Sequence, residues 1–457
     1  MYDFPYRDHF YRDEKDEAIA IITSVYVNGE GEQEGHYEEI TISSDSLIDE
    51  SFEMQEAITD NSSLNFQNCI SSYVQFTTKY VEKSLLGCWL NIYKLLNIPN
   101  PSTGEADWKQ IPLGRFYVVE DDISYDGITQ NIIAYDALYS VINLNQENVK
   151  AIYDNIYDSV YPVNIKNFRD YFFSQFSIEQ DSTSLINDDI VLPRQLSDNE
   201  VISGYDIVKC IAEINGVFPH MGKDGLLHWI SLDVGEIDET ALYPNSNTYP
   251  SINTYPGKGY EGQYTDIYKN HYESNSCVWA SYKTLKPDGV QIRNQDSTIA
   301  YFANADGSTN PYIVINNFMC YDLEPGQYQT IAERLYKQIK GIGYVPFEVH
   351  KMGDPCLEVG DRVVVHTEEN ILFSSYIFNK HTTEIRGSFE DIQTNGTYTL
   401  SYYDVGQSDR KLKDLDSRVG NLEKSGSGPL QILSVRELPD NPQLNILYLI
   451  QGEVVVT

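Results

Sequence analysis

The residues in this sequence that could perform chemistry are its carboxylates and its histidines. Two runs of adjacent acids, Glu120-Asp121-Asp122 and Asp188-Asp189, could support glycoside hydrolysis, which needs two carboxyl groups facing each other across a cleft. The chain has 68 Asp and Glu residues, so adjacent pairs are expected by chance. The eight histidines are scattered among strand-like residues, which is more typical of structural than of catalytic positions. We therefore expect a protein without enzymatic activity.

Motifs that bind cofactors and metals are missing. The sequence has no G-x-x-x-x-G-K-[ST], no G-x-G-x-x-G after an expected strand, no H-E-x-x-H and no G-x-S-x-G, so the usual phosphate, dinucleotide, zinc-protease and esterase sites are unsupported. The six cysteines lie tens of residues apart without a C-x-x-C pair, which excludes zinc spacing and indicates free thiols assembled in a reducing cytosol. We expect no cofactor and no metal.

Length and charge narrow the class of protein. A chain of 457 residues predicts about three domains of roughly 150 residues each. The 32 basic and 68 acidic residues give a net charge of −36, so the basic footprint of a nucleic-acid-binding protein is absent. No apolar run approaches the ~18 residues that a membrane helix needs, and the N-terminus does not resemble a signal peptide. We expect soluble globular domains.

The N-terminal third alternates between short β-branched or aromatic runs and polar turns, which predicts antiparallel strands. Asp126-Gly127 marks a tight turn between two of them. The expected strands are Ile19–Tyr26, Glu38–Ile42, Ser72–Thr78, Leu90–Leu96, Arg115–Glu120 and Thr129–Tyr135. We expect them to form a first tube-like β-barrel within residues 1–145.

The hydrophobic period then changes to three and four residues, which predicts amphipathic helices in an α+β domain over 146–235. In the clearest of them, Gly204–Asn215, Ser203 is the expected N-cap and Gly216 the expected stop. A hairpin follows around the turn at Lys223-Asp224-Gly225.

Residues 236–326 are rich in Tyr, Asn and turn signals and predict a domain of short strands and long loops. A helix over 327–341 then leads into a second β-barrel, within 327–405. Its expected strands are Pro346–His350, Arg362–Thr367, Leu372–His381, Glu384–Gly387 and Asp391–Asn395. The fold class is therefore mainly β with α+β parts.

The segment 408–424 carries Leu412, Leu415, Val419 and Leu422 at spacings of three, four and three, which is the seam of a short coiled coil. Two heptads are marginal alone, so we expect this trimerisation seam to follow an oligomer built upstream. The alternative is a single amphipathic helix that packs on its own domain.

The C-terminal residues 425–457 consist of a Ser/Gly linker and a β segment too short for a core of its own. Such a segment needs a partner. We expect a C-terminal docking site at Leu447, Tyr448, Leu449 and Ile450.

Three stretches together resemble one family, the hub proteins at the tail tip or baseplate of tailed bacteriophages and prophages. The first runs from Ile111–Val118 to Ile133–Tyr139 and the second from Ser203–Ile207 to Gly222–Gly225. The third is a turn before the second barrel, built on Gly353, Asp354, Pro355, Glu358, Gly360 and Asp361. The stretches occur in the family's order and are structural turns rather than reactive sites.

The resemblance implies a homotrimer whose two tube-like barrels per chain match a six-fold tail tube above and a three-fold tail tip below. Implied partners are a distal tail or tail-tube protein above and a tip, spike or fibre protein below. Tape-measure protein and DNA would pass the channel without specific binding, and the location would be the virion tail tip. Many relatives continue into an enzymatic domain, and this chain stops at residue 457.

Two other functions remain open from the sequence. One is a tail-associated peptidoglycan hydrolase or its anchoring half, which would need a cleft with convergent carboxylates or a metal. The other is a receptor- or carbohydrate-binding tip, which the Tyr- and Asn-rich residues 240–312 suggest.

Overall fold

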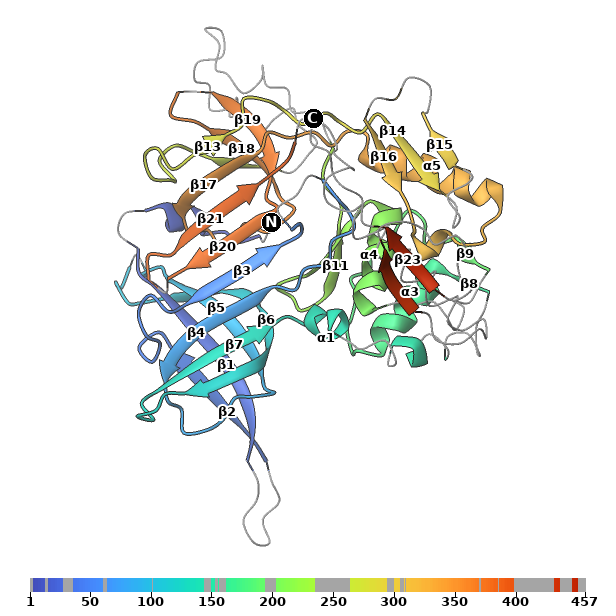
Figure 1. The fold of residues 1–457 in the computed structure, drawn as a ribbon. Coiled ribbons are helices and arrows are strands. Elements are labelled where there is room, and N and C mark those ends of the chain that lie inside the picture. The colour runs from blue at the N-terminus through green and yellow to red at the C-terminus, as the bar shows by residue number, and fades with distance from the viewer. Residues whose placement is uncertain are drawn as a thin grey trace.

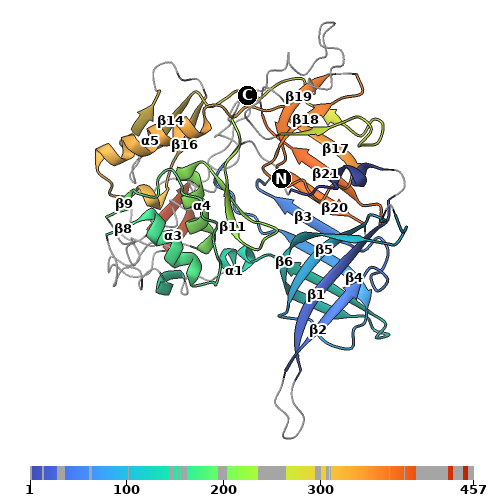
Figure 2. The ribbon, with the colours of Figure 1, turned by 180° about the vertical axis from the view of Figure 1, so that it is seen from behind.

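The structure is a computed structural model, and it is mainly β, as predicted (Figure 1). One lobe holds the long strands and the other holds the helices with several short strands (Figures 1 and 2). The described residues are 3–12, 15–27, 36–60, 64–100, 102–143, 149–152, 155, 162–193, 203–234, 264–293, 300–304, 308, 310–369, 371–384, 386–397, 431–435 and 446–450.

The first β-unit is an antiparallel array of strands that follow one another in the chain. Inward residues alternate with outward ones along β1 and β5, which is the pattern of strands with one buried face. The strands are β1 (Glu17–Val27), β2 (His36–Ser43), β3 (Glu53–Ala57), β4 (Tyr73–Lys79), β5 (Trp89–Asn97), β6 (Trp108–Ile123) and β7 (Thr129–Tyr135).

The longest strand, β6, bends where its pairing with β5 shifts register between Ile92 and Tyr93. Gly114 lies at this irregularity with a φ of 143°, a conformation that side chains rarely adopt. The bend lets one strand pair with β5 along its first part and with β7 along its last part.

The second β-unit is assembled from strands that lie further apart in the sequence. Four of them belong to a large sheet: β13 (Val278–Trp279), β17 (Phe347–Met352), β20 (Asn379–Thr383) and β21 (Phe389–Thr394). Three others form a separate sheet in the order β12 (Thr265–Ile267), β18 (Arg362–His366) and β19 (Leu372–Tyr376).

The two β-units share one sheet. Its order is β13-β17-β21-β20-β3-β4-β7-β6-β5-β1-β2, and β20 of the second unit pairs with β3 of the first over five residues, from Asn379↔Ala57 to Thr383↔Glu53. The prediction of two barrels therefore needs correction, because the described strands form no closed barrel. The first unit comes nearest to closure through a bridge between Leu47 and Thr78.

Three sequence predictions fail within these strands. Leu372–His381 is two strands, because the chain leaves one sheet after Tyr376 and joins another at Asn379. The described residues of the expected strand Glu384–Gly387 are not in a strand, and Glu384 and Gly387 have positive φ values. Strand β3 was not predicted, because Glu56 occupies one of its buried positions. A charged residue at a buried position interrupts the alternation of apolar and polar residues by which a strand is recognised.

The helical lobe is built around α4 (Gly204–Asn215), which begins and ends as predicted. Ser203 and Asp206 form a capping box, and Gly216 ends the helix with a φ of 61°. The other helices are η1 (Arg7–Tyr11) in the β lobe and α1 (Leu138–Ile142), α3 (Ile165–Ser174), η2 (Phe318–Cys320) and α5 (Pro325–Ile339). The remaining strands before the C-terminal segment are β8 (Val163–Asn164), β9 (Val191–Leu192), β10 (Phe218–Met221), β11 (Leu227–Ile230), β14 (Gly289–Arg293), β15 (Ala300–Ala303) and β16 (Pro311–Val314).

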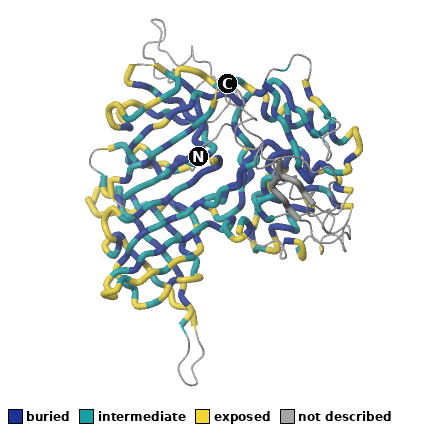
Figure 3. The backbone as a smooth tube through the Cα atoms, in the orientation of Figure 1, coloured by how far each residue is buried: buried dark blue, intermediate teal, exposed yellow. Residues whose placement is uncertain are grey.

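Two large hydrophobic cores divide the molecule. The first β-unit has a core of its own, which contains Ile21, Phe76 and Phe116. The second β-unit shares a core with the helical lobe, in which Val349 and Ile392 join Ile211 and other helix residues. Burial follows the sheet interiors, and exposure gathers at the turns (Figure 3).

Two short strands lie near the C-terminus, β22 (Gln431–Val435) and β23 (Ile446–Ile450), and they pair in parallel. The predicted docking residues Leu447, Tyr448, Leu449 and Ile450 fall on β23. The predicted seam, 408–424, lies outside the described residues. A search of the described helices finds none long and apolar enough to span a membrane.

Candidate functional site

The Gly353–Asp361 turn, the third of the stretches named in the sequence, lies between β17 and β18 at the junction of the two β-units. Gly353 and Gly360 of this turn leave no room for a side chain. A Cβ on Gly353 would lie 2.2 Å from Ser388 Oγ, because the Gly353 amide donates to the Ser388 carbonyl at 2.6 Å. Gly360 has a φ of 88°, and a Cβ there would lie 2.4 Å from Ile230.

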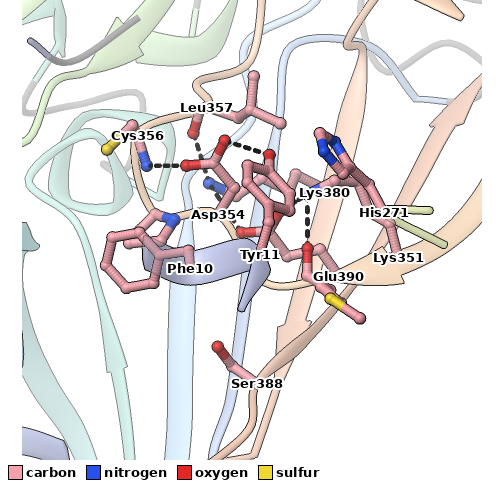
Figure 4. Close-up of polar contacts among 12 residues, drawn as sticks. Phe10, Tyr11, His271, Lys351, Asp354, Cys356, Leu357, Lys380, Ser388 and Glu390 are labelled. Carbon is pink, nitrogen blue, oxygen red and sulfur yellow. Dashed lines mark hydrogen bonds and ion pairs between the residues drawn. The ribbon is translucent and has the colours of Figure 1, made fainter. Parts of the chain in front are cut away.

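Asp354 is the centre of this turn, and it is completely buried. One carboxylate oxygen accepts hydrogen bonds from Arg7 Nε at 2.7 Å and from the Tyr11 hydroxyl at 2.6 Å. The other accepts from the Cys356 amide at 3.0 Å (Figure 4). Burial would raise the pKa of Asp354, but Arg7 and Lys351 outweigh it and lower the pKa to about 2. Asp354 is therefore a charged anchor.

The anchor holds an N-terminal strap, residues 3–12, which contains the 3-10 helix η1. Phe10 is fully buried in a small core with Leu96, Ile111 and Cys356. The Tyr11 ring stacks on His271 with 3.7 Å between ring centroids (Figure 4). The strap therefore contacts strands of the first β-unit and the turn of the second at once.

Buried ion pairs continue this junction between the units. Lys380 on β20 pairs with Glu56 on β3 at 2.8 Å, and Lys351 on β17 pairs with Glu390 on β21 at 3.1 Å. All four side chains are at most 4% exposed. Burial would raise the pKa of Glu56, but Lys380 and other nearby cations lower it. The pairing keeps these groups charged away from water.

A third buried pair extends the junction into the first β-unit. Lys94 on β5 pairs with Glu17 on β1 at 2.7 Å. Ser388, whose carbonyl also holds Gly353, accepts from Lys94 Nζ at 3.1 Å and donates to Glu17 at 3.3 Å. Ser388 therefore connects the turn to β1 and β5.

The second resembling stretch reaches the same turn. Lys223, in the turn between β10 and β11, is 8% exposed and donates to the Pro355 carbonyl. It also lies 3.9 Å from Glu358. Within the turn, Asp361 accepts from the Glu358 amide at 2.9 Å.

Helix α1, in which the first stretch ends, contacts the start of the second. Asp136 accepts from the Ser72 amide at 2.7 Å and the Leu138 amide at 3.0 Å, which fixes the passage from β7 into α1. A Cβ on Gly204, the first residue of α4, would lie 2.1 Å from the Val141 carbonyl near the end of α1. The first stretch also meets the Gly353–Asp361 turn, because Ile111 and Cys356 share a small core.

The chemistry available at the junction is structural. The described residues include no group of three His, Cys, Asp or Glu side chains arranged to hold a metal ion. The six cysteines are unpaired, and burial raises the pKa of every one of their thiols, so none is a ready thiolate nucleophile near pH 7.

The cleft that a hydrolase would need was also sought among the described residues. A cleft of about 170 Å³ is lined by Glu56 and Asp136 together with Trp89 and Arg115. Both carboxylates already hold the fold, Glu56 through Lys380 and Asp136 through backbone amides. The runs Glu120-Asp121-Asp122 and Asp188-Asp189 do not line this cleft.

Sequence reasoning found the Gly353–Asp361 turn but missed the strap and the buried ion pairs. The sequence did indicate the lysines of these ion pairs, since Lys94, Lys351 and Lys380 interrupt otherwise strand-like runs. Lysine is rarely buried unless it is paired, so ion pairs could have been predicted at these positions. Their partners could not be assigned from sequence, because Glu56 and Lys380 lie more than 300 residues apart.

Comparison with known proteins gives a consistent but distant picture. No protein-family profile matches the chain, and no curated protein matches it. Solved structures similar to it include a tail protein from Neisseria meningitidis MC58, with a TM-score of 0.42, 10% identity, and coverage of 84% of this chain and 98% of that one. A second is the 43 kDa tail protein of prophage MuSo2 from Shewanella oneidensis (TM-score 0.44, 12% identity, 82% and 98% coverage).

A third similar structure is the prophage tail protein gp18 from Listeria monocytogenes EGD-e, with a TM-score of 0.43, 10% identity, and coverage of 82% of this chain and 95% of that one. All three of these structures are tail proteins, and two of them come from prophages. At these identities and TM-scores the likeness is distant.

Proposed function

We propose that this chain is a structural hub protein in the tail of a bacteriophage or prophage. Three copies would form a ring that adapts a six-fold tail tube to a three-fold tail tip and leaves a channel for DNA. A distal tail or tube protein would lie above the ring and a tip, spike or fibre protein below it, at the tail tip of the virion. The protein would act through shape and symmetry, without catalysis.

The observation that carries the proposal is the joined sheet. Strand β20 of the second β-unit pairs with β3 of the first over five residues, so two β-units lie edge to edge in one chain. Three such chains would present six units around an axis. Most soluble homo-oligomers have closed point-group symmetry, and a three-fold ring is one of its forms.

The shared sheet offers a suitable channel wall. On six neighbouring strands, β17, β21, β20, β3, β4 and β7, one face is buried and the other carries half-exposed polar and aromatic side chains. The only Lys or Arg on this outer face of the described strands is Lys79, at the end of β4. The outer face carries Glu53, Gln55, Tyr73, Gln75, Thr77, Asn131, Ile133, Tyr135, Glu348, His350, His381, Asp391 and Gln393.

Such a wall would let DNA pass without holding it. Affinity for DNA comes mainly from Lys and Arg side chains that neutralise phosphates. Acids on the face, such as Glu53, Glu348 and Asp391, repel phosphates instead. The net charge of −36 favours the same outcome.

The junction explains how the units would keep a fixed angle in the ring. The strap, the Gly353–Asp361 turn and the buried ion pairs contact both units. A rigid angle is necessary, because an error between units within one chain would prevent three copies from closing into a ring.

The experiment is the native mass of the purified full-length protein by light scattering. The chain has a mass of 52.2 kDa, and we expect a species of about three times that mass. A monomer at every concentration, both alone and with its neighbouring tail proteins, would contradict the proposal. Leu415→Asp at the predicted seam should weaken trimers without unfolding the β-units.

A further inference from the structure

The strands β1, β4 and β6 of the first β-unit run in the same direction, so their ends meet at one edge of the unit. β1 is antiparallel to β5 and β5 to β6, while β6 and β4 are both antiparallel to β7. We call this edge the loop end. It comprises the β1–β2 arm (described residues 24–27 and 36–39), the end of β4 with the loop after it (79–88), and the end of β6 with the β6–β7 hairpin (120–129).

Direct contacts join these three segments into one surface. Lys83 in the loop forms an ion pair with Glu38 of the arm. Asp121, near the end of β6, accepts from the Leu85 amide at 2.6 Å and from Gln130 Nε2 at 2.7 Å. The Tyr80 amide donates to the Ile128 carbonyl at 2.8 Å. The loop end is therefore a continuous surface.

The loop end exposes large apolar side chains. Tyr37 is 73% exposed, Leu86 60% and Ile128 63%. Grouped exposed apolar residues of this size mark interaction sites on soluble proteins, whereas single ones are ordinary. The exposed large side chains here are Tyr26, Tyr37, Leu86, Ile123, Tyr125 and Ile128.

The arm extends beyond the main strand pairing of the sheet, although Val25 is buried and Glu38 pairs with Lys83. β1 pairs with β5 only as far as Thr23, and beyond that point Ser24–Val27 pair only with His36–Glu39 of β2. Figures 1 and 2 show this ribbon projecting from the β lobe. Two-stranded ribbons are marginally stable in water, and the Tyr26 and Tyr37 rings pack on each other at 5.3 Å. Contact with another protein would stabilise the ribbon.

Charge identifies the kind of partner. The described acids at the loop end outnumber the bases, which are Lys79 and Lys83. An acidic surface repels DNA, anionic lipid and a second copy of the same surface. The acids are Glu38, Glu39, Glu82, Glu120, Asp121, Asp122 and Asp126.

We propose that the loop end is a docking surface for a different protein, whose facing loops combine Lys or Arg side chains with apolar ones. Tyrosine and aliphatic side chains at the loop end would bury against the partner's apolar residues, and its basic residues would pair with the acidic rim. That this partner is a tail component rests on the proposed function. The docking surface itself does not.

The test places a photo-crosslinking amino acid, p-benzoylphenylalanine, at Tyr125 of the full-length protein in the cells that produce it with its natural neighbours. The control carries it at Phe302, which is 43% exposed on β15. We expect a crosslink to a different protein from Tyr125 only, within a peptide that contains Lys or Arg. Crosslinks from Tyr125 only to another copy, to lipid or to DNA, or none at all, would overturn the proposal.

A charge reversal separates docking from general damage. In the Tyr125 crosslinking background, Glu39→Lys with Asp122→Lys should reduce the crosslink by about tenfold, because both exposed acids belong to the rim. Glu105→Lys with Glu333→Lys changes the charge equally at exposed positions elsewhere and should leave the crosslink unchanged. An equal loss in both pairs would contradict the proposal. The native mass of each variant reports trimer formation separately, so failure of the hub function would be seen independently.

Discussion

The two β-units of this protein are assembled by different routes. The first uses consecutive strands, mostly joined by short connections, around an apolar core of its own. The second collects strands from β12 to β21, a stretch that also contains part of the helical lobe, and shares its core with that lobe. The first unit is therefore organised locally, whereas the second depends on its neighbours.

Both units bury charge: the first pairs Lys94 with Glu17 on its own strands, whereas Lys380 of the second takes its partner from the first. Buried Lys351, Lys380 and Glu390 lie on sheet strands of the second unit, and Lys380 is matched by Glu56 from the first. Ion pairs buried in this way add little net stability but are costly to break. The Lys380–Glu56 pair spans β20 and β3, which indicates that this pair helps to fix which strand edges meet.

The largest expected effect comes from breaking this match. Lys380→Met removes the cation and leaves Glu56 and Glu390 buried without it. We expect the free energy of unfolding to fall by about 3–5 kcal/mol, measured by chemical denaturation. Lys337→Met, at an exposed position on α5, is the control.

A second variant sharpens this test. Adding Glu56→Gln to Lys380→Met removes the Glu56 carboxylate that Lys380 had neutralised, so the double variant should regain part of the lost stability. If Lys380→Met unfolds at the same denaturant concentration as the unaltered protein, the buried pair does not couple the units.

The next effect concerns the space between the turn and β21. Gly353→Ala would place a Cβ 2.2 Å from Ser388 Oγ and 2.7 Å from the Ser388 carbonyl oxygen, so backbone must move. We expect a loss of about 1–3 kcal/mol in unfolding free energy. Gly326→Ala has no neighbour within 4 Å and should have little effect. Equal midpoints for both alanine variants would refute the tight junction.

The strap makes the junction sensitive to acid. The pKa of Asp354 is lowered to about 2 from 3.8, so its contribution is present above about pH 4 and is lost as pH falls towards 2. The shift corresponds to about 2 kcal/mol. The stability difference between the unaltered protein and Asp354→Asn should therefore shrink from pH 5 to pH 2. A constant difference across this range would show that Arg7 and Tyr11 do not depend on the charge.

The smallest effect belongs to the exposed contact between the same two units. Arg386 and Asp45 form an ion pair at 2.8 Å with side chains 66% and 86% exposed. Exposed pairs contribute little because water and salt screen them. Asp45→Ala should change the unfolding free energy by less than about 0.5 kcal/mol. A loss comparable to that of Lys380→Met would mean that burial does not distinguish the contacts.

The same contrast explains what the sequence could predict. Most strands of the first unit and helix α4 were predicted well because alternation, caps and turns are local signals. The Gly353–Asp361 turn was also identified from its own residues. The boundary between β19 and β20 was not, since a continuous β-like run gives no sign of the point at which the chain changes sheet.

The parts that sequence could not provide are long-range. The pairing of β3 with β20 and the contact of Arg7 with Asp354 join residues more than 300 positions apart. No local pattern specifies such partners. The coiled-coil seam at Leu412, Leu415, Val419 and Leu422 stays a prediction, as does docking by Leu447–Ile450 on β23.

Electron cryomicroscopy of the native assembly would show how many β-units surround the axis. We expect three chains around an open axis, with six β-units in a ring and the half-exposed face of the shared sheet turned inward. A single isolated chain, or a ring in which each chain places only one β-unit around the axis, would contradict it.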